Sequence, residues 1–214
     1  MTALKRYFSN KQFLISFGGS VLLLLASLVV NFYAGIYATE KASNYVTDII
    51  LDNIPVFNVD LVFIYGPLVL WSFVLIIFFN RPQTVPFTVK SIALFVLVRS
   101  MFITLTHIGP FPDAATIDYT SDFVKKFTFG GDLFFSAHTG LPFLMALVFN
   151  QNRKWRAFFA LAAVFFGAIV LMGHLHYSID VLSAFFITYT IFHIAKYIFK
   201  KDHELFNNGL SHSD

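Results

Sequence analysis

Two short motifs hold most of the chain's reactive side chains, and each lies near the start of a long apolar segment. The first motif, GGDLFFSAHT, contains Gly130, Asp132, Phe135, Ser136, His138 and Thr139. The second motif, HYSID, runs from His176 to Asp180. Charged side chains cost about 2.5–3.5 kcal/mol each on membrane-insertion scales, so those found within apolar segments usually have a function. Two histidines and an aspartate in such places indicate phosphoryl transfer at a membrane surface.

The spacing of His176 and Asp180, four residues apart, predicts that they share one face of a helix. Asp180 could then accept a hydrogen bond from one imidazole nitrogen and leave the other free as a nucleophile, as in a catalytic triad. A position at the start of a helix also attracts phosphate. The alternative is a packing pair whose polar groups are satisfied by neighbours.

The first motif offers a second histidine beside hydrogen-bond donors. Its glycines allow the backbone to approach a phosphate, and Ser136 and Thr139 could donate to it. Arg99 is the only Arg in the interior of a predicted span, and its planar guanidinium suits phosphate oxygens. His138 could instead be a packing residue, and Arg99 could extend to the interface. Asp132 is either a helix N-cap or a contact for a cationic head group.

A zinc site is an alternative, with His138, His174, His176 and Asp180 as its ligands. The chain has no HExxH motif and no histidine-rich cluster. We therefore expect catalysis without a metal or any other cofactor.

Composition defines the class of protein. The 214 residues are 57% hydrophobic and 13% charged, whereas soluble domains are about 45–50% apolar and about 25% charged, so we expect a single-domain integral membrane protein. The net charge of +3 is not gathered into a basic domain and gives no argument for nucleic-acid binding. The absence of Cys excludes disulfides and thiolate catalysis.

The predicted fold is all-α, with six membrane-spanning helices that position these motifs. A span needs about 20 apolar residues. The six candidates are Phe13–Tyr37, which we interpret as an uncleaved anchor, Asp60–Phe79, Pro86–His107, Asp132–Phe149 with a kink at Pro142, Trp155–Gly173 and His176–Phe199. We expect residues 1–12 to be a cytoplasmic segment, 13–200 the catalytic domain, and 201–214 a frayed cytoplasmic tail.

Basic residues predict the orientation. Ten Lys or Arg residues fall on the side of the two termini, and only three fall in the opposite loops, 38–59 and 109–131. This asymmetry predicts cytoplasmic termini. The opposite loops then face the periplasm or the exterior, and we expect a bacterial inner membrane protein.

The same topology brings the reactive residues to one depth. Arg99 would lie ~12 Å from the outer end of the third span, His138 ~9 Å into the fourth, and Asp180 ~6 Å into the sixth. Three separate segments thus converge near the outer leaflet.

The motifs resemble those of a known family. GGDLFFSAHTG is similar to the G-D-x-x-F-S-G-H-T motif of sphingomyelin synthases, and HYSIDVLSAFFIT to their H-Y-T-I-D-V-x-x-A-Y-Y-I-T motif. The segment from Arg99 to Pro112 resembles their R-x-x-x-x-x-T-x-L-P-x-P pattern. The resemblance covers roughly residues 50–200, and this family lies within the superfamily of type 2 phosphatidate phosphatases.

The resemblance implies a role for each residue. His176 would be the nucleophile that forms a phosphohistidine, Asp180 its orienting partner, and His138 the acid for the leaving oxygen. The expected substrate-binding residues are Arg99, Asp132, Ser136, Thr139 and Tyr177. The implied partners are a membrane phospholipid donor and a lipid hydroxyl acceptor such as ceramide, or water.

Three departures refine the expectation. Ala137 replaces the Gly before the catalytic histidine, and the phosphatase branch has Lys and Arg where this chain has Ile92 and Val170. Fewer cations suit a singly charged phosphodiester better than a phosphomonoester. We therefore expect a head-group phosphotransferase or a phospholipase C-type enzyme, in a minimal bacterial form. The alternatives are a lipid phosphate phosphatase and a non-enzymatic lipid transporter or structural membrane protein.

Overall fold

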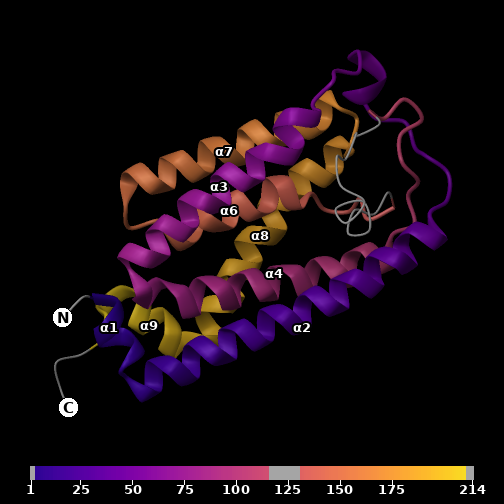
Figure 1. Ribbon diagram of the computed structural model, residues 1–214. Helices are drawn as coiled ribbons and strands as arrows, with labels where there is room; N and C mark the ends of the chain where they lie inside the picture. Colours follow the sequence, from indigo (N-terminus) through magenta and orange to yellow (C-terminus); the bar gives the residue numbers. More distant parts are fainter. Residues whose placement is uncertain (1–2, 116–130, 211–214) are drawn as a thin grey trace.

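The computed structural model describes residues 3–115 and 131–210, and these residues are helical with no β-strand, as predicted. The elements are α1 (Ala3–Phe8), α2 (Lys11–Lys41), η1 (Leu51–Asn53), α3 (Asp60–Asn80), η2 (Pro82–Thr84), α4 (Val85–Leu105), α6 (Ala137–Val148), α7 (Arg153–Met172), α8 (Ser178–Ile198) and α9 (Lys200–Asn208). Figure 1 shows the long helices side by side, with α1 and α9 at one end and the long loops at the other.

Five of the described helices, rather than six, are long and apolar enough to cross a membrane: α2, α3, α4, α7 and α8. The fourth predicted span is a helix only from Ala137, and α6 has 12 residues, which correspond to about 18 Å. Residues before Ser136 are not helical because Arg99 binds Asp132 and the carbonyl of Phe135. The span count of six therefore stays a prediction.

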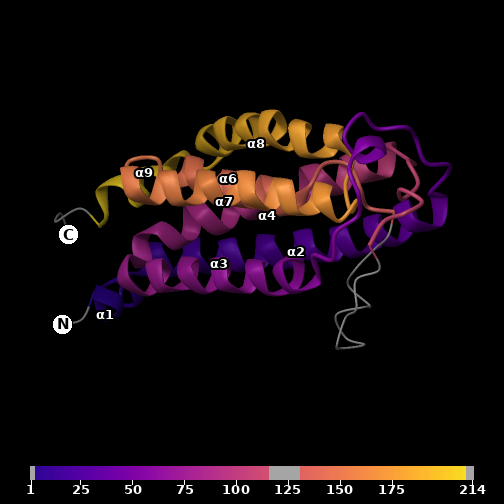
Figure 2. The same cartoon turned by 90° about the horizontal axis from the view of Figure 1, so that it is seen from above.

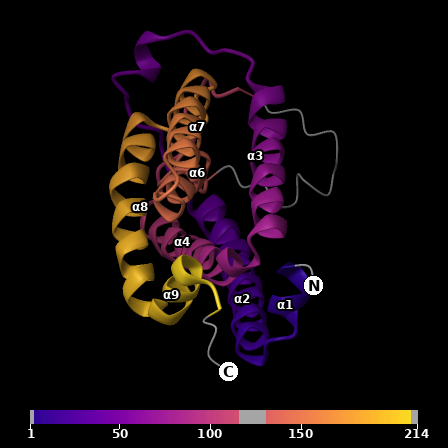
Figure 3. The same ribbon diagram turned by 90° about the vertical axis from the view of Figure 1, so that its left-hand side faces the viewer.

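The helices form two layers that meet at α4. Helix α2 packs along α4, whereas α6 packs against α7 and α8, as the end-on view shows (Figure 3). Figure 2 shows α8 and α3 on opposite sides of α6 and α7. The core between the layers is rich in phenylalanine; its fully buried members include Phe87, Phe95, Phe135 and Phe159.

Large apolar side chains also cover the outside of the bundle. One example from each of α2, α3, α7 and α8 is at least two-thirds exposed: Leu22 69%, Val69 71%, Leu161 71% and Phe186 68%. Such surfaces are unusual for a soluble protein and fit contact with lipid. The chain thus has the features of an integral membrane protein.

The segment expected to be a frayed tail forms a docked helix instead. The Asp202 carboxylate of α9 lies 2.7 Å from Lys90 Nζ of α4, and it also accepts a hydrogen bond from Ser16 of α2. Asp202 is buried, and the pair stabilises its charge there. Lys90 accordingly points to this carboxylate.

Candidate active site

The turn before α8 places His176 beside Asp180, but not on a shared helix face as predicted. Helix α8 begins at Ser178, because Tyr177 has extended backbone (φ −72°, ψ 158°) and serves as N-cap. Asp180, in the first turn, accepts a hydrogen bond from the Tyr177 backbone N–H at 2.9 Å. The oxygen that accepts this bond, Asp180 Oδ2, also lies 3.5 Å from His176 Nδ1. Asp180 therefore shapes the turn and faces the imidazole with one oxygen.

Both side chains lie in a buried polar environment that is not fully satisfied. Asp180 is completely buried and His176 is 8% exposed. Among the described residues, His176 Nδ1 and Asp180 Oδ1 have no hydrogen-bond partner. Buried polar atoms without partners need an explanation, and hydrogen bonds of catalytic groups are often long in the absence of substrate. Because Nδ1 faces Asp180, Nε2 is the nitrogen left for chemistry.

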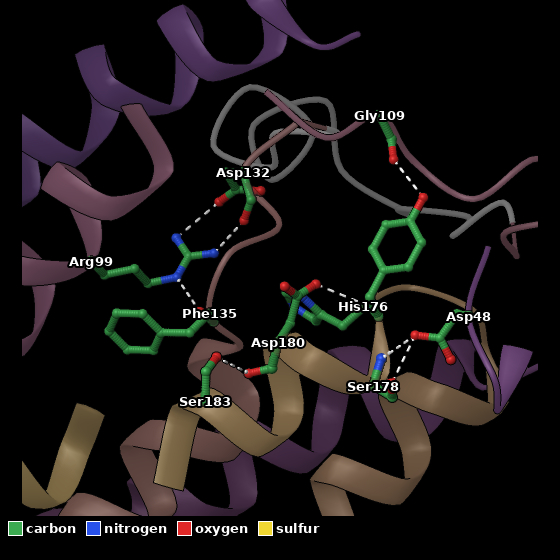
Figure 4. A network of polar contacts seen from close by, with 10 residues as sticks. Asp48, Arg99, Gly109, Asp132, Phe135, His176, Ser178, Asp180 and Ser183 are labelled. Carbon is green, nitrogen blue, oxygen red and sulfur yellow. Dashed lines mark hydrogen bonds and ion pairs between the residues drawn. The ribbon is translucent and has the colours of Figure 1, made fainter. Parts of the chain in front are cut away.

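Arg99 organises the segment that precedes α6. Its Nε donates to the Phe135 carbonyl at 3.0 Å, and Nη1 lies 3.1 Å from the Asp132 carboxylate. Nη2 donates to the Asp132 carbonyl. Asp132 is thus the partner of Arg99 and not a helix N-cap, a position that Ser136 occupies. The bonds from α4 to this segment are visible in Figure 4.

Gly131 permits this arrangement because the segment passes close to the end of α2. A Cβ at Gly131 would lie 2.7 Å from the Ala38 carbonyl oxygen, closer than real Cβ atoms come to backbone. The Gly131 N–H also lies 3.3 Å from the hydroxyl of Thr39, to which it donates. Gly130, the other glycine of the motif, is outside the described residues.

The backbone of Asp180 connects the two motifs. Its carbonyl accepts hydrogen bonds from the Ser136 N–H at 3.1 Å and from the Ser183 hydroxyl at 3.2 Å. His138 is the second residue of α6, two residues after Ser136, and its ring stacks on Phe63 of α3 at 4.1 Å between centroids. Arg99 of α4 donates to the carbonyl of Phe135, one residue before Ser136. Residues from α4, α6 and the start of α8 therefore meet at one place.

Other predicted site residues lie around this centre with different contacts. The Tyr177 hydroxyl donates to the Gly109 carbonyl at 2.8 Å, and the ring is 1% exposed. Thr139 is buried in α6 and lies against α7. A Cβ added to Gly167 of α7 would lie 3.3 Å from the Thr139 hydroxyl oxygen. The hydroxyls of Ser136 and Thr139 have no partner among the described residues. The Arg99 guanidinium binds Asp132 instead.

An apolar cavity opens beside His138. Its volume is about 140 Å³, and it lies between α3, α6 and α7. Its lining consists of Pro67, Leu70, Trp71, Ala137, His138, Leu141, Pro142 and Phe166. His138 is the only ionisable side chain of this lining, so the cavity offers hydrocarbon contact next to one proton-transfer group.

Asp48, in the loop after α2, is a site residue that the motifs did not indicate. Its Oδ2 accepts hydrogen bonds from the Ser178 N–H at 2.7 Å and from the Ser178 hydroxyl at 2.8 Å. Burial raises the pKa of the Asp48 carboxyl, but bonds from Ser178, Ile50 and Leu51 outweigh burial, and the net pKa lies below its ordinary value. The contact joins residues 130 positions apart, so no local sequence signal could have found it.

The residues that the structure describes contain no group of three His, Cys, Asp or Glu side chains that could hold a metal ion. His174, the fourth residue of the zinc alternative, is buried with φ 53°, and its ring packs edge-on against Phe111. Both of its ring nitrogens lack a partner among those residues. Metal independence stays a prediction.

Comparison with known proteins agrees with the motifs. Residues 130–197 match the family model described as PAP2 superfamily C-terminal. No curated protein and no solved structure matches the chain. The matched segment covers less than half of the chain, but it contains His138, His176 and Asp180. The match supports placement of this chain in the PAP2, or type 2 phosphatidate phosphatase, superfamily of lipid phosphatases and phosphotransferases.

Proposed function

We propose that this chain is a membrane enzyme that removes the phosphodiester head group from a glycerophospholipid and transfers it to a lipid hydroxyl, such as that of ceramide, or to water. The observation that carries the proposal is the double contact of Asp180. Its carboxylate faces His176, and its carbonyl holds Ser136, two residues before His138. One residue thereby sets the separation of a candidate nucleophile and a candidate acid.

In the proposed first step, His176 Nε2 attacks phosphorus and forms an N–P bond as the P–O bond to diacylglycerol breaks. The His138 imidazolium donates its proton to the departing oxygen, which leaves as a neutral alcohol. The head group remains on His176 as a phosphohistidine diester. Asp180 stabilises the positive charge that forms on the imidazole.

In the proposed second step, His138, now neutral, accepts a proton from the incoming hydroxyl. The acceptor oxygen bonds to phosphorus, the N–P bond breaks, and both histidines return to their starting protonation. Arg99 would stabilise charge on the non-bridging oxygens through both steps. Asp132 holds the guanidinium in place and partly neutralises it.

The charge balance supports a phosphodiester over a phosphomonoester. The positions of the two phosphatase-branch cations lie in the apolar interior: Val170 is fully buried and Ile92 belongs to the main core cluster. Among the described residues, Arg99 is the basic side chain that contacts the segment before His138, and it is already paired with Asp132. A dianionic monoester would meet little positive charge there, whereas a diester carries one negative charge.

The cavity beside His138 supports a lipid substrate. Its apolar lining between α3 and α6 fits an acyl chain, with the leaving oxygen toward the imidazole. We further propose that the site faces the periplasm or the exterior of a bacterial inner membrane, because the basic residues gather at the opposite end.

The test uses the purified full-length chain in phospholipid nanodiscs with head-group-labelled phosphatidylcholine, phosphatidylethanolamine or phosphatidic acid, with and without ceramide. From the two phosphodiesters, phosphatidylcholine and phosphatidylethanolamine, we expect diacylglycerol as one product. The other product should be a new lipid that carries the head group, or the free phosphorylated head group. We expect His176→Asn to be inactive. The control His193→Asn should retain activity, because His193 is exposed and lies in the C-terminal half of α8, away from the site. Release of inorganic phosphate from phosphatidic acid alone would instead identify a lipid phosphatase. No turnover of any lipid would favour a transporter or a structural protein.

A further inference from the structure

The loop between α2 and α3 contains a carboxylate that is fixed before it reaches the active-site turn. Asp48 is buried, and its Oδ1 accepts hydrogen bonds from the N–H groups of Ile50 at 2.9 Å and Leu51 at 3.1 Å. Its own N–H donates to Asp52 Oδ2 at 2.8 Å. The side chain therefore has little rotational freedom.

The other oxygen of Asp48 binds the start of α8. The N–H groups in the first turn of a helix have no partner within the helix. Asp48 Oδ2 takes the N–H of Ser178, the first residue of α8, together with its hydroxyl. Figure 4 shows this contact on the opposite side of His176 from Arg99 and Asp132. A carboxylate at this end also interacts favourably with the helix dipole.

Further contacts hold the backbone on both sides of His176. The Leu175 N–H donates to the Val170 carbonyl at 2.9 Å, just before the histidine. Just after it, the Tyr177 hydroxyl donates to the Gly109 carbonyl and lies 3.4 Å from the Val46 N–H. The imidazole therefore extends from a turn that is held on one side by the last turn of α7 and on the other by the loops that contain Val46 and Gly109.

We propose that Asp48 is a positioning residue that holds the α8 start so that His176 Nε2 points at the substrate phosphorus. The inference rests on the proposed function, because it assigns His176 as nucleophile. Asp48 acts through Ser178 and the Tyr177 turn, and it does not touch the reacting atoms. The loop after α2 thus belongs to the catalytic machinery, although the family match begins at residue 130.

The test compares Asp48→Ala and Asp48→Asn with Asp113→Asn as the matched control. Asp113 is an acidic residue of another loop at the same end; it is exposed, and no contact of its side chain is found in the described structure. Rapid-quench experiments with head-group-labelled phospholipid measure the rate constant and the amplitude of covalent intermediate formation. A misplaced nucleophile lowers the rate constant, whereas partial unfolding lowers the amplitude.

For Asp48→Ala we expect a rate constant reduced roughly 10- to 100-fold, because small displacements of reacting groups have effects of that size. Amplitude and KM should stay near those of the wild type. Asp48→Asn keeps an acceptor oxygen, so its rate constant should lie between those of Asp48→Ala and the wild type. The rate constant of Asp113→Asn should match that of the wild type. A rate constant unchanged in Asp48→Ala, or a loss of amplitude alone, would overturn the inference.

Hydrogen exchange makes the result independent of the proposed chemistry. In Asp48→Ala, a peptide covering residues 175–182 should exchange faster than in Asp113→Asn. Unchanged protection would overturn the positioning role even if wild-type protein formed no intermediate. If the wild type forms no intermediate but exchange is faster in Asp48→Ala, the proposed nucleophile is contradicted. The role of Asp48 in holding the start of α8 is then still supported.

Discussion

Replacement of Asp180 by Asn would separate the chemical role of this residue from its structural role. Asp180 Oδ2 accepts from the Tyr177 N–H at 2.9 Å and lies 3.5 Å from His176 Nδ1. Asn has the same shape, and its amide oxygen can keep the bond to Tyr177. That oxygen is also the one that faces Nδ1, so Asn keeps both contacts and removes only the negative charge.

The change should cost much activity and little stability. Without the negative charge, the imidazolium that forms as Nε2 attacks phosphorus loses its stabilising partner. In a comparable triad this exchange lowers the rate about 10⁴-fold, equivalent to about 5.4 kcal/mol of transition-state stabilisation. Because the cap contact survives, the free energy of unfolding should fall by no more than about 1–2 kcal/mol.

Two measurements on the same preparation test this reasoning. Head-group release from phospholipid in nanodiscs gives the rate, and thermal unfolding gives the stability. Asp180→Ala is the comparison variant, because it removes the cap as well as the charge and should unfold at a lower temperature than Asp180→Asn. If Asp180→Asn retained activity within about tenfold of the wild type, the role of the carboxylate charge would be refuted.

Four further outcomes follow from the site and its surroundings. His138→Ala should lose about 10²–10⁴ in rate on phospholipid but much less on a nitrophenyl phosphodiester, whose leaving group needs no proton; equal losses would exclude an acid role. EDTA should leave activity unchanged, and loss restored by zinc or magnesium would contradict the mechanism. Cysteine introduced as Asp113→Cys should react with an impermeant thiol reagent in intact cells while Lys154→Cys does not; the reverse pattern would place the site at the cytoplasmic leaflet. Hydrogen bonds hold the pKa of the Asp48 carboxyl below its ordinary value of 3.8, so its contribution to stability is complete above about pH 4 and is lost as the pH falls through the folded-state pKa. Acid unfolding of Asp48→Asn should therefore depend less on pH in that range, and identical profiles would exclude this contribution.

The sequence was sufficient for the helical class and for the proximity of the segments that carry Arg99, His138 and Asp180; the catalytic roles of these residues stay a prediction. Arg99, His138 and Asp180 were predicted at a common depth from apolar run lengths and the positive-inside rule, and their contacts do link three segments. Hydropathy alone can do this because span length and side-chain cost are set by the membrane rather than by neighbours.

Helix starts and long-range partners could not be predicted in this way. Ser136 and Tyr177 are the N-caps, several residues beyond Asp132 and one beyond His176. Arg99 binds the segment before α6 in a non-helical form, and the carboxylate of Asp180 caps α8 at Tyr177. The bond from Asp48 to Ser178 depends on loop packing that no local pattern records.

The docked C-terminal helix shows the same limit. A polar segment after the last span predicts a frayed tail. Its Asp202 is nevertheless buried against Lys90, which the sequence places 112 residues earlier. Charge complementarity across that separation becomes visible only when the helices are packed together.

In the proposed mechanism, His176 carries the head group between donor and acceptor. The most direct measurement is rapid acid-free quenching of the full-length enzyme with phospholipid labelled at the head-group phosphorus, followed by peptide mapping by mass spectrometry. We expect a phosphorylated head group on the imidazole of His176, present in the wild type, absent in His176→Asn, and consumed when ceramide is added. Label on another residue, or no covalent label while product accumulates, would contradict it.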